Sequence, residues 1–266
     1  MDRKKKERVD TALVRRGLAP SREKAQALIL AGLVWSRGLR LEKAGQTIEA
    51  DRDLEVKQTL PFVGRGGLKL AEALDSFGLK VEGWMAVDLG ASTGGFTDCL
   101  LQRGARRVAA VDVNVRQLDQ KLRTDPRVRL IEKNARYLER SDIPEAVDLV
   151  TADLSFISIL KVLPAIKNFL GGGLLLALLK PQFEAGRRQV GRKGVVRDSA
   201  VHEQVLRALA SGAAAMGFHL QGLIKCSTVG ARGNREFFGL WSLTSAGLGK
   251  EDVERLIGEV VRDEKD

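Results

Sequence analysis

The pattern of hydrophobic positions changes near residue 60 and again at Trp84. Before residue 60, apolar residues recur at helical spacing over 7–18 and 21–31, with Ser21 as the expected N-cap of the second helix. Short strands separated by glycine turns follow, carrying Val34, Leu39, Leu41 and Ile48. We therefore expect a small α+β domain at the N-terminus.

From Trp84 onward, short apolar runs alternate with helical stretches, and a helix over 68–77 precedes them. The alternation favours an α/β fold, a Rossmann-like mostly parallel sheet with helices on both faces. The predicted domains are 1–60 and 68–266, joined by a linker at 61–67. The expected strands are 85–89, 107–112, 128–131, 147–152, 174–179, 218–225 and 236–243, and the expected helices are 95–103, 114–123, 158–169, 199–216 and 250–262.

Composition narrows the functional classes. The chain of 266 residues carries a formal charge of +10, and residues 1–60 supply +5 of it. Such an excess favours a polyanionic partner such as nucleic acid. Two cysteines argue against a disulfide framework, and the most apolar stretch, Phe169 to Leu179, contains three glycines and is too short to span a bilayer. We expect a cytoplasmic protein that neither enters a membrane nor requires a metal.

A glycine-rich turn follows the strand that ends at Asp88. A P-loop would need Gly-Lys-Ser/Thr at its close, and a dinucleotide loop would need glycine at position 92, which is serine. The pattern Asp-x-Gly-x-x-x-Gly-Gly instead fits a methyltransferase loop, so S-adenosylmethionine is the expected cofactor. The candidate residues of this loop are Asp88, Gly90, Ser92, Thr93, Gly94, Gly95 and Phe96.

Two polar residues at the ends of the next strands extend this prediction. Asp112 lies about twenty residues past the loop, where an acid can accept hydrogen bonds from ribose hydroxyls. A helix N-cap is the alternative role for Asp112. Asn134 is expected near the adenine, although a plain turn residue is an equal alternative.

Three charged residues stand at the ends of apolar strands: Asp153, Lys180 and Glu236. Polar groups at the carboxyl ends of parallel strands face the ligand crevice. The strand before Lys180 is almost purely apolar, so we expect this lysine to be partly desolvated, which favours the neutral amine, a base. It could take the proton of a ribose 2′-hydroxyl while Asp153 and Glu236 position the groups.

Methylation of a base is less consistent with the sequence. Amino-group methyltransferases of this fold usually carry Asn/Asp-Pro-Pro-aromatic, whereas Asp153 is followed by Leu-Ser-Phe. Methylation of pyrimidine carbon needs a nucleophilic cysteine, and neither Cys99 nor Cys226 is suitably placed.

These motifs resemble the TlyA, or haemolysin A, family of bacterial ribosomal RNA 2′-O-methyltransferases over nearly the whole chain. The matching segments begin at Val63, Asp88, Asp153, Lys180 and Gly233. By resemblance to this family and to FtsJ-type enzymes, a Lys-Asp-Lys-Glu tetrad comprises Lys69, Asp153, Lys180 and Glu236. The pattern alone indicated a surface lysine at Lys69. Gly64 departs from the serine usual in relatives.

The N-terminal part resembles the S-four RNA-binding module, which implies binding to structured RNA through its backbone and shape. The loop over 186–194 adds further cations. The candidate RNA contacts are Arg3, Lys4, Arg15, Arg16, Arg22, Lys24, Arg65, Arg187, Arg188 and Arg192. The resemblance implies methylation of cytidine in 23S and/or 16S ribosomal RNA. The alternatives are a ribosome-assembly factor with a vestigial cofactor site and a membrane-lysing protein.

Overall fold

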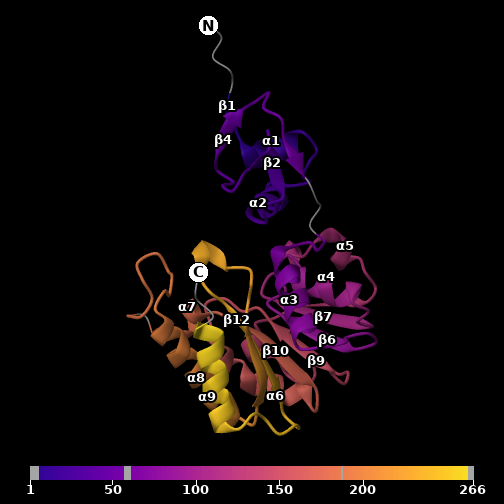
Figure 1. Ribbon diagram of the computed structural model, residues 1–266. Coiled ribbons are helices and arrows are strands. Elements are labelled where there is room, and N and C mark those ends of the chain that lie inside the picture. The colour runs from indigo at the N-terminus through magenta and orange to yellow at the C-terminus, as the bar shows by residue number, and fades with distance from the viewer. Residues whose placement is uncertain (1–5, 57–60, 187, 263–266) are drawn as a thin grey trace. The chain divides into compact units, whose positions relative to one another are not determined.

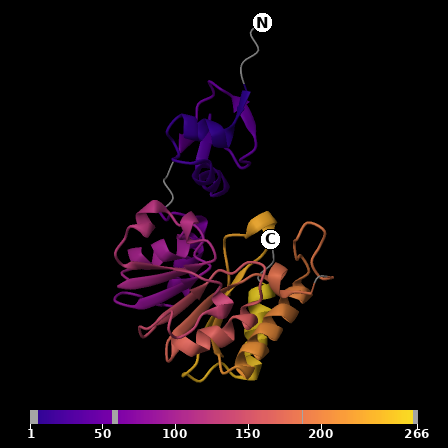
Figure 2. The ribbon, with the colours of Figure 1, turned by 180° about the vertical axis from the view of Figure 1, so that it is seen from behind.

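The computed structural model describes residues 6–56, 61–186 and 188–262 (Figures 1 and 2). The chain forms two compact units, Met1–Leu68 and Lys69–Asp266.

The first unit has two helices and two small antiparallel sheets. Its elements are β1 (Lys6–Arg8), α1 (Val9–Arg15), α2 (Arg22–Leu30), β2 (Val34–Ser36), β3 (Leu39–Arg40), β4 (Thr47–Glu49) and β5 (Glu55–Val56). The predicted helix over 7–18 is shorter at both ends. Residues 6–8 pair with β4 as a strand, and the helix ends at Arg15, before Gly17 with its φ of +69°. Ser21 caps α2 as expected, since its hydroxyl accepts the backbone N–H of Lys24 at 3.2 Å.

A buried carboxylate ties the two helices of this unit together. Asp10 in α1 has no solvent exposure, and it accepts hydrogen bonds from Arg8, Arg22 and Gln26. The guanidinium of Arg8 is the main cause of the lowered pKa of Asp10, against the opposing effect of burial. The carboxylate therefore links the start of α1 to α2 across a core of apolar side chains.

The second unit is built on a seven-stranded sheet of order β11-β12-β10-β9-β6-β7-β8, flanked by helices (Figures 1 and 2). Strand β12 runs antiparallel to both its neighbours, β10 and β11, and the other described pairs of this sheet are parallel. The strands are β6 (Met85–Leu89), β7 (Arg107–Asp112), β8 (Val128–Glu132), β9 (Leu149–Ala152), β10 (Leu174–Leu179), β11 (His219–Lys225) and β12 (Phe237–Ser242). This arrangement confirms the predicted α/β class.

The helices of the second unit agree with the sequence pattern except at two places where a predicted helix is split. They are α3 (Arg65–Ser76), α4 (Gly95–Gln102), η1 (Val115–Gln117), α5 (Gln120–Arg123), η2 (Ala135–Tyr137), η3 (Ile159–Lys161), α6 (Leu163–Leu170), α7 (Pro181–Glu184), α8 (Ser199–Ala215), η4 (Ala231–Gly233) and α9 (Lys250–Arg262). Helix α3, whose first residues belong to the N-terminal unit, begins three residues earlier than expected.

Two predicted helices are wrong as continuous elements. The helix over 114–123 is split, because Asn114 and Asp119 each cap a separate short turn and Leu118 between them is extended. The helix over 158–169 is split into η3 and α6, and Pro164 lies in the first turn of α6. Proline has no N–H to donate to the preceding turn, so a new helix begins there.

Candidate active site

The sheet topology brings three sequence-predicted residues to one edge. Asp153 follows β9 and Lys180 follows β10, so both lie at the carboxyl ends of parallel strands. Strand β12 runs the opposite way, and its first residue, Phe237, pairs with the last residue of β10. The beginning of β12 therefore lies at the same edge, and Glu236 stands just before it.

The four predicted catalytic side chains form two lysine–carboxylate pairs. Lys180 Nζ contacts Asp153 Oδ1 as an ion pair and donates to Ser155 Oγ at 3.1 Å. Lys69 Nζ donates to Glu236 Oε2 at 2.5 Å. The side chains of Lys69 and Glu236 are only 11% and 3% exposed, so this pair is largely desolvated. Burial makes the charges of the pair dependent on each other.

Lys69 is therefore not the surface lysine that the residue pattern indicated. It lies on α3 one turn before Ala73, and next to Leu70, both of which are fully buried. Its i,i+4 relation to Ala73 was the available signal, because residues four apart share a helix face. Sequence alone did not show that Glu236 lies opposite that face.

The Glu236 carboxylate is held on several sides. Gln182 Nε2 on α7 donates to its Oε1 at 3.3 Å. A Cβ built on Gly230 would lie only 2.0 Å from Oε1, so the carboxylate packs directly against the Gly230 backbone. The backbone carbonyl of Glu236 accepts the N–H of Cys226 at 2.9 Å. These contacts define the position in which the carboxylate meets Lys69.

A cavity of about 970 Å³ lies beside Asp153 at the same edge of the sheet. Its wall includes Gly90, Ser92, Asp112 and Asn134, four of the predicted cofactor residues. Gly90 has a φ of +82°, and a Cβ there would lie 2.5 Å from the backbone oxygen of Asp153. Only glycine allows this close approach between the loop and Asp153.

Asp112 lines the cavity, and the N-cap of the following short helix is Asn114 rather than Asp112. Its Oδ2 accepts the N–H of Ser92 at 2.9 Å, and its Oδ1 accepts the N–H of Asn114 at 2.9 Å. Gln117 Nε2 also donates to Oδ1 at 3.3 Å, so these contacts use three of the roughly four lone-pair sites of the carboxylate and leave one acceptor site. Asn134 likewise lines the cavity and caps η2 by accepting the N–H of Arg136.

The other predicted loop residues do not line this cavity. Gly94 has a φ of +96°, and a Cβ there would clash with Leu122 at 2.3 Å, while buried Phe96 packs against Phe238 with ring centroids 5.9 Å apart. Gly95 is buried at the start of α4, and Thr93 is exposed. These residues shape the loop and the helix behind it.

Asp88 lies beneath the loop with no solvent exposure. Its carboxylate accepts the hydroxyls of Thr97 at 2.7 Å and Thr151 at 3.2 Å. Burial is the main reason that the pKa of Asp88 is raised to about 7, and the negative charge of Asp153 adds to the effect. Asp88 therefore fixes the floor of the site and has no surface on the cavity.

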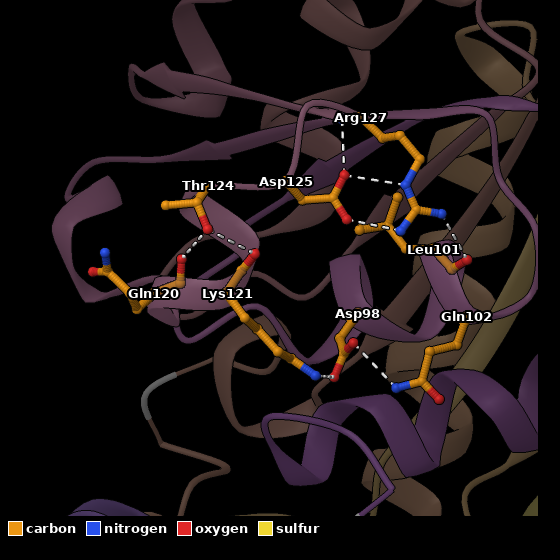
Figure 3. A network of polar contacts seen from close by, with 8 residues as sticks. All are labelled: Asp98, Leu101, Gln102, Gln120, Lys121, Thr124, Asp125 and Arg127. Carbon is orange, nitrogen blue, oxygen red and sulfur yellow. Dashed lines mark hydrogen bonds and ion pairs between the residues drawn. The ribbon is translucent and has the colours of Figure 1, made fainter.

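The helix that starts after the glycine loop is anchored from outside (Figure 3). Asp98 in α4 is nearly buried, and its carboxylate accepts Lys121 Nζ at 3.0 Å and Gln102 Nε2 at 3.1 Å. The backbone N–H of Asp119 also donates to the carbonyl of Thr93 at 3.1 Å. These contacts tie the segment around α5 to the glycine loop and to α4.

The predicted RNA-contacting side chains differ in how many hydrogen bonds and ion pairs they already form within the protein. Arg16 donates to the carbonyls of Ala50 and Arg52, and Lys24 donates to that of Phe62. The other N-terminal candidates are bound to acids, Arg15 to Glu7 and Arg22 to Asp10, but each remains about half exposed. Arg65 is partly buried at the start of α3, and Arg3, Lys4 and Arg187 lie outside the described residues.

Arg188 and Arg192 are exposed in the segment between α7 and α8. Within the described chain, neither of them forms an ion pair. Over the same residues, no cluster of three metal-ligating side chains occurs, and no helix has the length and apolar character needed to cross a bilayer.

The glycine loop, the cavity and the two lysine–acid pairs on this sheet define a Rossmann-like methyltransferase. Residues 62–241 match the model of the FtsJ-like methyltransferase family, and residues 7–52 match that of the S4 domain. The chain belongs to the FtsJ-like methyltransferase family, in its TlyA branch. Both the expected fold and the expected family are confirmed.

Three relatives illustrate the match. The chain is 47% identical to the candidate rRNA methyltransferase YqxC of Bacillus subtilis (97% of this chain, 92% of the relative). It is 43% identical to the 16S/23S rRNA (cytidine-2′-O)-methyltransferase TlyA of Mycobacterium tuberculosis (95% and 97%). A solved structure described as a candidate hemolysin from Streptococcus thermophilus is 42% identical, with a TM-score of 0.75 (97% and 96%).

Proposed function

We propose that this protein is an S-adenosylmethionine-dependent methyltransferase that methylates the ribose 2′-hydroxyl of cytidine in 23S and/or 16S ribosomal RNA. The observation that carries the proposal is the pair Lys180–Asp153 beside a cavity walled by Gly90 and Asp112. The curated relative with this activity, TlyA of Mycobacterium tuberculosis, matches the chain over nearly its full length.

The residues of the cavity suit the proposed cofactor. The volume of about 970 Å³ lies at the upper end of the range usual for ligand pockets. Asp112 and Asn134 line the cavity and offer acceptors suited to ribose hydroxyls and an adenine amino group, and Gly90 adds no side chain to the lining. When bound, S-adenosylmethionine would supply an electrophilic methyl group.

Lys180 is the proposed base. A 2′-hydroxyl becomes a good nucleophile only when its proton leaves, and an amine can accept that proton. Asp153, which lines the cavity and contacts Lys180 Nζ, would hold the amine in place for this step. The Lys180 side chain is 12% exposed, so bulk water screens its interactions little.

Lys69 and Glu236 form the second half of the proposed tetrad. The Lys69 ammonium, held by Glu236, can stabilise negative charge that develops on the ribose oxygen. Because the pair is already in place, this stabilisation needs no rearrangement during the reaction. The other predicted cofactor residues, Asp88, Gly94, Gly95 and Phe96, support the loop from behind.

The proposed RNA-binding site comprises the domain over 1–60 and the segment that carries Arg188 and Arg192. The match to an S4 domain over 7–52 and the charge of +5 over 1–60 support the first part. Residues 61–67 would connect it to the catalytic domain over 68–266. A ribosomal substrate would make the cytoplasm the place of action.

The test is transfer of labelled methyl groups to ribosomal subunits from cells that lack this protein, with the modified nucleotide mapped by mass. Lys180→Ala should abolish transfer, while Lys167→Ala should not, because Lys167 Nζ only donates to the carbonyl of Met216. Full activity of Lys180→Ala would rule out the proposed base. Failure of the wild-type protein to bind S-adenosylmethionine in calorimetry would favour an assembly factor instead.

A further inference from the structure

The side chain of Asn234 joins the loop that leads into Glu236 to the segment between α7 and α8. It is 2% exposed, and both ends of its amide bind the segment between α7 and α8. Its Oδ1 accepts the N–H of Val196 at 3.1 Å, and its Nδ2 donates to the carbonyl of Gly194 at 2.9 Å. A buried amide with both ends used in this way fixes the distance between the segments it joins.

The backbone of Asn234 closes the turn that forms the wall behind Glu236. Its carbonyl accepts the N–H of Gly230 at 2.7 Å. Gly230 is the residue whose backbone packs directly against the Glu236 carboxylate. A change in the position of Asn234 therefore reaches the carboxylate by two routes: through Gly230, and along the two residues of chain that lead to Glu236.

The segment held by Asn234 carries unpaired positive charge. We call residues 186–198 the basic loop; within its described part, Arg188, Arg192 and Lys193 form no ion pair. Two further contacts fasten it near Asn234. Arg232 donates to the carbonyl of Lys193 at 3.0 Å, and His202 Nε2 lies 3.2 Å from the carbonyl of Val196.

We propose that Asn234 is a positioning residue that links RNA binding by the basic loop to the catalytic placement of Glu236 against Lys69. RNA phosphates bound by the basic loop would keep the loop in contact with Asn234. Asn234 in turn would keep the Gly230 backbone, and with it the Glu236 carboxylate, in place. The proposal rests on the methyltransferase function proposed above and adds a residue that would contact neither substrate nor cofactor. Its effect acts through Glu236.

The first experiment separates the rate of methyl transfer from RNA binding. Asn234→Ala should lower the single-turnover rate at saturating RNA and cofactor by about 10- to 100-fold, since displacement of a catalytic group by an ångström can cost 100-fold. Asn234→Asp, which keeps the acceptor for Val196 N–H, should retain more activity than Asn234→Ala. Thermal unfolding identifies any variant that does not fold.

The matched control removes another anchor of the same loop. Gln189 Nε2 donates to Gln204 Oε1 at 2.7 Å on the exposed side of α8, with no contact to Glu236. Gln204→Ala should raise KM for RNA without lowering the single-turnover rate. Faster tryptic cleavage after Arg188, Arg192 or Lys193 should mark the release of the loop in both variants.

A double variant tests the route through Glu236. Glu236→Gln should retain measurable activity, and adding Asn234→Ala to it should lower the rate much less than in the wild-type background, because residues acting through one group are not additive. A fully additive loss, or a wild-type rate for folded Asn234→Ala, overturns the proposal. Absence of transfer by the wild-type protein refutes the proposed function instead, and the two failures are thus distinguishable.

Discussion

Replacement of Gly90 by alanine tests how closely the cofactor loop and the proposed catalytic acid depend on each other. A Cβ at Gly90 would lie 2.5 Å from the backbone oxygen of Asp153, and ordinary contact begins at 3.4 Å, so the two must separate by about 0.9 Å. Asp153 cannot retreat freely, because its N–H donates to the carbonyl of Leu89 at 2.9 Å. The strain is therefore expected to move the side chain that holds Lys180.

A displacement of this size is expected to lower the rate of methyl transfer about 100-fold, which corresponds to about 2.7 kcal/mol in activation free energy. The left-handed backbone at Gly90 adds about 1–2 kcal/mol of folding cost. Single-turnover methyl transfer and calorimetric S-adenosylmethionine binding measure the first effect, and urea unfolding measures the second.

Gly78→Ala is the matched control for this variant. Gly78 has a φ of +63°, yet nothing lies within 4 Å of a Cβ built there. It therefore carries a similar backbone penalty without a clash, and Gly78→Ala should lose stability but keep its transfer rate. A folded Gly90→Ala with the wild-type rate, or an equal loss of rate in Gly78→Ala, would refute the reasoning.

Three further predictions follow from the described contacts. The pKa of Asp88 is raised from 3.8 to about 7, so the free energy of unfolding should fall as pH rises from about 4 to 7. Asp88→Asn should flatten this pH dependence in urea unfolding, and an unchanged profile in the variant would contradict the prediction. Burial raises the pKa of Cys99 and Cys226 to about 12, so thiol reagents at pH 8 should modify neither until the protein is unfolded. Ser21→Ala should lower the thermal stability of the N-terminal unit by about 1 kcal/mol, whereas Ser21→Asp should not.

Much of the fold follows from local periodicity. The apolar run Leu174–Leu179 predicted a strand covered on both faces, and it forms β10 between β9 and β12. The helix over 250–262 was also predicted with its observed bounds. Errors arose where a short polar side chain could start a new turn, as Asn114 and Asp119 do, because capping competes with helix continuation over only a few residues.

The candidate site was predictable to the extent that it depends on strand ends. Asp153 and Lys180 end parallel strands, so the sequence predicted their common edge, and the glycine loop after β6 predicted a cofactor there. The sequence could not show that Asp88 is enclosed beneath the loop, because its neighbours Thr97 and Thr151 come from other elements.

The sequence by itself determined the order of strands and helices, the glycine loop and the family to which the chain belongs. Only the tertiary structure decided which partners those residues meet: Lys69 with Glu236, 167 positions away, and Asn234 with the basic loop. The physical reason is that periodicity and capping act within a few residues, whereas ion pairs and buried amides depend on how distant segments pack.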